Sequence, residues 1–70
     1  MLKKELLLSF MALHNDNSKS LAEYLNITPT RFSQKLNETK NAYFTKEEME
    51  RIKAKYKLSN KAFMQIFFAL

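Results

Sequence analysis

Residues 18–37, SKSLAEYLNITPTRFSQKLN, contain two helical patterns with a very short break between them. Apolar residues in the first half follow the spacing of one helix face, which predicts a short helix over 18–25. Thr28 can cap a free backbone amide, and Pro29 suits the first helical position because it has no N–H to leave unpaired. A second helix is therefore expected over 29–37, after a sharp turn. The apolar positions of the first helix are Leu21, Ala22 and Leu25.

The start of the first of these helices can be assigned in more than one way. Asn17 or Ser18 can cap it, because both side chains accept a hydrogen bond from a free amide. Ser20 with Glu23 also fits a capping box, in which two residues three positions apart satisfy each other's backbone amides. The sequence leaves these alternatives open.

A helix is also expected before this stretch, over residues 2–13. Leu6, Phe10 and Leu13 follow the helical period and predict its apolar stripe. Two further apolar residues, Leu7 and Met11, flank this stripe.

Two more helices are expected in the C-terminal half, over residues 45–57 and 59–69. Thr45 and Glu48 form a capping box at the start of the first, and Ser59 caps the second. The periodicity is helical from end to end, so no strand is expected. The sequence predicts an all-α fold, a compact five-helix bundle in which the 70 residues form a single domain.

The composition excludes several kinds of site. Cysteine is absent, which rules out disulfides and thiolate metal sites, and the lone histidine, His14, has no partner for a metal ion. Glycine is absent too, which rules out loops whose backbone must approach a nucleotide phosphate. We expect no cofactor, no metal and no enzymatic activity. The net charge of +5 favours a polyanion or an acidic protein as the partner.

We expect neither end of the sequence to be a targeting or membrane segment. Glu5 interrupts the apolar run near the N-terminus, and no small-residue cleavage site follows that run. The apolar tail 62–70 is far shorter than the ~20 residues that span a bilayer. We therefore expect a cytoplasmic protein without a membrane partner.

The predicted helix 29–37 has two different sides. On a helical wheel, Phe32 and Leu36 form an apolar edge, and polar side chains gather opposite them. This polar side suits the major groove of duplex DNA, which admits one α-helix and displays donors and acceptors on base edges. Arg31 can bond guanine and Gln34 adenine in bidentate fashion. The polar side comprises Thr30, Gln34 and Asn37, with Arg31 and Ser33 at its margins.

The stretches LAEYLNIT (21–28) and FSQKLN (32–37) resemble the helix-turn-helix of Cro/CI-type domains of phage repressors. Those domains have an alanine in the first helix, a small turn residue four positions later and an apolar residue six beyond that. Ala22, Asn26 and Phe32 hold these positions here. The resemblance covers essentially the whole chain, since five helices in a chain of this length is the family's architecture. It implies a lambda-repressor-like DNA-binding domain.

The resemblance further implies a sequence-specific transcriptional regulator that places helix 29–37 in the major groove of double-stranded DNA. The family's contacts fall at the start of the first motif helix and along the outer face of the second. Carried over residue by residue, they are Ser18, Lys19, Thr28, Thr30, Arg31, Ser33, Gln34, Asn37 and Lys40. This chain departs from the family in having Asn26 for the turn glycine, Pro29 at a base-reading position and Glu38 near the expected phosphates.

The sequence does not decide between two roles for each of two surfaces in the C-terminal half. The last helix is either widely buried in a small core or partly exposed as the interface of a homodimer. The candidate interface residues are Phe63, Met64, Phe67, Phe68 and Leu70. The cations of residues 51–61 are either a second phosphate-binding patch or a solvated helix face.

A second functional hypothesis keeps the same fold. In it, the chain binds a repressor protein and alters the DNA binding of that repressor. Glu38, beside the polar helix, and the apolar last helix favour it. The two hypotheses differ in their dependence on salt, because a DNA-binding protein loses affinity steeply as salt rises.

Overall fold

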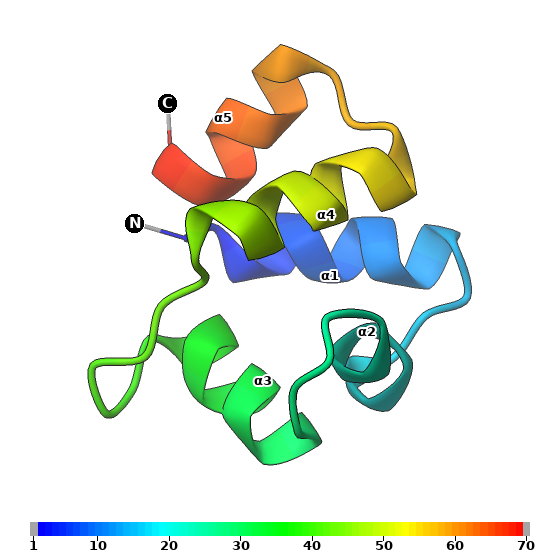
Figure 1. Cartoon of the computed structure of the whole chain (residues 1–70). Coiled ribbons are helices and arrows are strands. Elements are labelled where there is room, and N and C mark those ends of the chain that lie inside the picture. The colour runs from blue at the N-terminus through cyan, green and yellow to red at the C-terminus, as the bar shows by residue number, and fades with distance from the viewer. Residues whose placement is uncertain (1, 70) are drawn as a thin grey trace.

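The computed structural model describes residues 2–69 and consists of helices joined by short loops (Figure 1). The helices are α1 (Lys4–Leu13), α2 (Ser18–Tyr24), α3 (Pro29–Asn37), α4 (Lys46–Tyr56) and α5 (Asn60–Phe68). Residues 2–69 contain no strand, so the prediction of a compact all-α fold is confirmed for them.

Side-chain caps start four of these helices. Thr28 Oγ1 accepts a hydrogen bond from the Arg31 amide at 3.1 Å, and Pro29 occupies the first position of α3. Thr45 and Glu48 form a capping box at α4, and the side chain of Ser59 caps α5. The alternatives at α2 are resolved in favour of Asn17, which forms a capping box with Ser20. Because a capping residue lies just outside its helix, α4 and α5 begin one residue later than the predicted ranges.

The helix α1 begins two residues later than predicted, because the Lys3 backbone is not helical and its amide has a partner in another helix. Lys3 has a non-helical backbone, with φ −90° and ψ 87°. Its N–H donates to the carbonyl of Ile66 in α5 at 2.7 Å. This bond ties the segment before α1 to the last helix.

Most helices end in a left-handed residue, although the chain has no glycine. Glu38, Lys57 and Ala69 cap the C-terminal ends of α3, α4 and α5 with φ between 50° and 54°. Asn15 and Asn26, with φ of 60° and 62°, follow α1 and α2. Asparagine tolerates this conformation better than most residues, but the other three carry the full steric cost of a side chain.

One hydrophobic core joins all five helices. In α1 the buried residues are Leu7 and Met11, whereas Leu13 is 74% exposed. The stripe predicted for this helix was therefore wrong at Leu13. Apolar residues lie almost all round α1, so periodicity alone does not select the buried side. The largest fully buried side chains are Phe32, Leu7, Leu21, Ile52 and Ile66.

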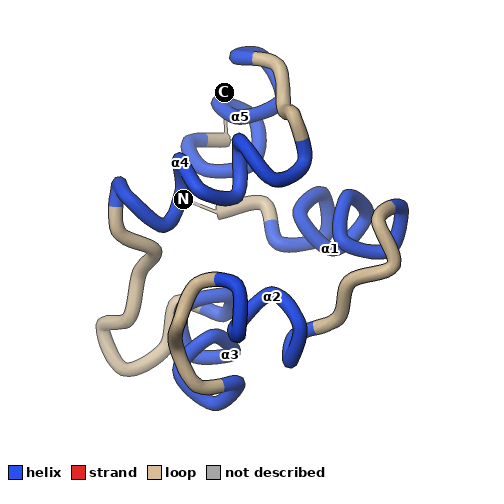
Figure 2. Tube along the Cα trace, turned by 45° about the vertical axis from the view of Figure 1, so that its right-hand side comes forward, coloured by secondary structure: helices blue, strands red, loops and turns tan. Residues whose placement is uncertain are grey.

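The helices are arranged so that α3 lies at one end of the molecule. In Figures 1 and 2, α2 and α3 lie together below α1, and α4 and α5 lie above it. The turn between α2 and α3 is closed by a hydrogen bond from the Ile27 amide to the Ala22 carbonyl at 2.9 Å. Within the described part of the chain, no helix has the length and apolar character to cross a membrane.

Candidate nucleic-acid interface

The nine residues that the resemblance assigns to DNA lie at the start of α2, on or next to α3, and in the loop that follows α3. Eight of them are exposed, and Gln34 is half-buried. On the opposite side of α3, Phe32 and Leu36 are buried in the core. The two sides of α3 therefore agree with the helical wheel. The exposed residues are Ser18, Lys19, Thr28, Thr30, Arg31, Ser33, Asn37 and Lys40.

Hydrogen bonds between neighbouring side chains order the polar side of α3. Arg31 Nη1 donates to Gln34 Oε1 at 3.3 Å. Asn37 Nδ2 donates to the Ser33 carbonyl at 2.9 Å, and Lys4 Nζ in α1 donates to Asn37 Oδ1 at 2.7 Å. The bond from Lys4 could not be foreseen, because it joins residues that lie far apart in the sequence. It adds a cation beside the C-terminal end of α3.

Thr28 and Ser18 lie at the starts of α3 and α2, and only Thr28 caps its helix. Thr28 Oγ1 accepts the capping hydrogen bond from the Arg31 amide, so this oxygen stabilises the start of α3. Ser18 lies inside the first turn of α2, one position after the cap. With Lys19, it is exposed at a helix N-terminus, where backbone amides favour negative charge.

A buried ion pair fixes α3 to α4. Lys35 is buried, and its ammonium lies 2.6 Å and 2.7 Å from the two carboxylate oxygens of Glu48. Burial alone raises the pKa of Glu48, but hydrogen bonds from Lys35 and the Thr45 amide outweigh it, and the pKa is lowered. Sequence reasoning assigned Glu48 to the capping box and to the first turn of its helix, and did not predict this ion pair. The sequence does contain one signal for it. Lys35 flanks the apolar edge of α3, and a lysine that is buried there needs a partner of opposite charge.

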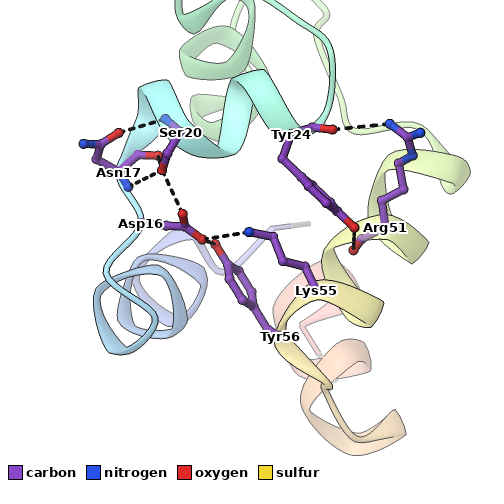
Figure 3. Close-up of polar contacts among 7 residues, drawn as sticks. All are labelled: Asp16, Asn17, Ser20, Tyr24, Arg51, Lys55 and Tyr56. Carbon is purple, nitrogen blue, oxygen red and sulfur yellow. Dashed lines mark hydrogen bonds and ion pairs between the residues drawn. The ribbon is translucent and has the colours of Figure 1, made fainter.

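A second polar cluster fixes the start of α2 to α4 (Figure 3). Asp16 accepts hydrogen bonds from the Tyr56 hydroxyl at 2.7 Å and the Ser20 hydroxyl at 2.8 Å, and Lys55 Nζ lies 3.6 Å from it. Burial raises the pKa of Asp16, but these contacts outweigh it and lower the pKa. Burial and the bond to Asp16 both raise the pKa of Tyr56.

The other end of α2 is fixed to α4 by Tyr24 and Arg51. The Tyr24 hydroxyl donates to the Arg51 carbonyl, and Arg51 Nη1 donates to the Tyr24 carbonyl, both at 3.4 Å. Lys55 Nζ lies 4.7 Å from the centre of the Tyr24 ring. The cations of residues 51–61 are therefore not one uniform patch, because Arg51 and Lys55 serve the contact between α2 and α4.

The candidate dimer residues of the last helix differ in how far their side chains are exposed. Phe67 is buried in the core, which removes it from the surface that a partner could contact. Phe63 is half-buried against the core. Met64 and Phe68 are 38% and 45% exposed, and Leu70 lies outside the described residues.

No cluster of three or more metal-binding side chains occurs in residues 2–69. No protein-family model, curated protein or solved structure shows a significant match to this chain. The function has to be inferred from the chain's own residues and their geometry.

Proposed function

We propose that this protein is a sequence-specific DNA-binding transcriptional regulator of the Cro/CI type. In this proposal α2 and α3 form a helix-turn-helix, and α3 enters the major groove. The observation that carries the proposal is the polar side of α3, which is exposed while Phe32 and Leu36 bury its opposite side. A recognition helix needs both properties, because its inner side must be held rigidly while its outer side reaches base edges.

The residues of this face have different roles in the proposed complex. Arg31 and Gln34 read base edges, since guanidinium and amide groups make bidentate bonds to guanine and adenine. The bond between them is long and exposed, so it is readily exchanged for bonds to bases. Thr30 offers a methyl group to thymine. Lys19 and Lys40 contact phosphates, which supply affinity and orientation without sequence preference.

Binding as a two-fold homodimer follows from the same proposal. One copy of α3 covers one half-site, and two copies would lie on half-sites about 34 Å apart along one side of the duplex. The operator is then expected to be a palindrome or close to one.

The proposal is tested by selecting bound duplexes from a random pool. We expect the wild-type chain to enrich one motif, and Arg31→Ala or Gln34→Ala to lose about 1–3 kcal/mol and to relax preference at one base pair. Lys61→Ala is the control, since it removes an exposed cation from α5, away from the polar side of α3. Unchanged preference in the Arg31→Ala and Gln34→Ala selections would contradict the assigned roles.

The alternative, a modulator that binds a repressor protein, is supported by Glu38. This acid directly follows α3 as its left-handed C-cap, next in the chain to the residues that are expected to meet phosphates. The modulator would show no binding to random duplex in about 50 mM salt. It would also form a complex with the repressor that alters operator occupancy.

A further inference from the structure

A groove with an apolar floor lies between α4 and α5, away from the polar side of α3. Its volume is about 770 Å³. A neighbouring hollow shares Met49 and Phe68 with it and extends to Tyr43, which is 58% exposed. Lys35 and Glu38 also line this hollow, so its lining is mixed rather than purely apolar. The floor residues are Met49, Ala54, Leu58, Phe63 and Phe68.

The groove is bordered by cations. Lys46, Lys53 and Lys57 line it together with a single acid, Glu50. Among the described residues, the only ion pairs are Lys35 with Glu48 and Lys55 with Asp16, so none of these three lysines is neutralised by a carboxylate. Lys53 Nζ lies 5.1 Å from the centre of the Phe63 ring, which places a positive charge over the apolar floor.

We propose that this groove binds an amphipathic helix of a partner protein whose polar side is acidic. Apolar residues at helical spacing on such a helix would pack on the floor, in the helix-in-groove mode of recognition. Carboxylates on its flanks would lie against Lys46, Lys53 and Lys57. Complementary charge favours this partner and disfavours basic ones.

Two other occupants fit the groove less well. A second copy of this chain would meet it through a two-fold contact, in which each surface patch faces itself. Such a contact would bring the lysines of one copy against those of the other, in a protein that already carries a net charge of +5. Duplex DNA would match the lysines but would leave the apolar floor without a partner.

Binding is measured with a labelled helical peptide by fluorescence anisotropy. The peptide carries leucines at helical spacing and glutamates on its polar side, and a matched peptide carries glutamine in place of glutamate. We expect the acidic peptide to bind at least about tenfold more tightly than the glutamine peptide, with the difference shrinking as salt rises.

Variants then locate the contact. Lys46→Glu/Lys57→Glu should weaken the acidic peptide at least about tenfold, because it reverses two charges at the groove. Lys61→Glu is a control for charge reversal outside the groove, since Lys61 is exposed on α5 but does not line the groove. It reverses one charge and should change affinity less than about twofold. Phe68→Ser removes an exposed apolar contact and should also weaken binding. Circular dichroism of each variant verifies that the helices remain folded.

Several results would overturn this proposal. They are equal affinity for the two peptides, no binding of the acidic peptide, or a dimer that Phe68→Ser dissociates. A loss of duplex binding in Lys46→Glu/Lys57→Glu, with peptide binding unchanged, would assign the lysines to DNA instead. The duplex selections with Arg31 and Gln34 variants are independent of these outcomes, so failure of one proposal is distinguishable from failure of the other.

Discussion

The ion pair of Lys35 with Glu48 is the individual contact that matters most for the orientation of α3. It lies on the side of α3 that faces α4, where both charges are largely withdrawn from water. Removing one partner of such a pair leaves the other charge desolvated without compensation, which is more destabilising than removing both.

We therefore predict that Lys35→Met lowers the free energy of unfolding by about 2–3 kcal/mol, below the 3–5 kcal/mol of fully buried pairs because Glu48 retains some access to water. The variant Lys35→Met/Glu48→Gln should recover part of this loss, since glutamine keeps the capping box and leaves no unpaired charge. Urea denaturation followed by circular dichroism measures both. A double variant less stable than Lys35→Met would contradict the explanation.

The lowered pKa values of Glu48 and Asp16 predict how stability depends on pH. Their ordinary values are 4.5 and 3.8, and folding lowers both. In the acidic range the unfolded chain therefore binds more protons than the folded one, so stability rises with pH. The contribution is fully present above the ordinary values and is lost as pH falls through the folded ones. Thermal unfolding between pH 7 and pH 3 should show this loss, and Asp16→Asn or Glu48→Gln should show a smaller one.

Among the helices, the caps of α3, α4 and α5 were predicted from local residues, whereas the buried side of α1 was not. Thr28, Thr45 and Ser59 cap their helices as expected, because a cap depends on residues within one helical turn. The buried side of α1 was not predicted correctly at Leu13, because the choice between apolar sides depends on the packing of distant helices.

The left-handed ends of the helices offer a test of strain. Lys57 ends α4 at φ 50° and ψ 47°, where a side chain costs about 1–2 kcal/mol relative to glycine. We predict that Lys57→Gly raises the free energy of unfolding by up to about 1 kcal/mol, since glycine also gains freedom in the unfolded chain. Lys57→Ala is the control and should give no such increase, because alanine keeps the Cβ atom. A melting temperature that rises equally in both variants would rule out relief of backbone strain.

The whole protein carries a net charge of +5, and the polar side of α3 lies at the surface, as the sequence predicted. All nine proposed contact residues are exposed or half-buried. For the five that lie on α3 this follows from the helical wheel, which fixes which side chains share a face. The wheel could not predict the bond from Lys4 to Asn37 or the cluster of Asp16 and Tyr56. Those contacts join segments that only the complete fold brings together.

The proposed complex with DNA predicts a specific dependence on salt. Each lysine that neutralises a phosphate contributes about −0.9 to the slope of log affinity against log salt. Lys40→Ala should therefore weaken binding to all sequences about equally and reduce the slope by about 1 per bound copy. Lys61→Ala on α5 is the control and should leave the slope unchanged. Titrations of a duplex between 50 and 200 mM salt measure both, and equal slopes for the wild type and Lys40→Ala would remove Lys40 from the interface.

The bond from the Lys3 amide to the Ile66 carbonyl has a consequence for synthesis in the cell. A ribosome adds about 5–20 residues per second, so the first helix emerges seconds before the last one, against which it packs. During that interval Leu7 and Met11 have no complete core to enter, and the nascent chain presents an apolar segment with no charge between Leu6 and Leu13. Chaperones that hold apolar segments therefore have an opportunity to bind α1 before α5 has been made, and the bond from Lys3 to Ile66 closes only after that.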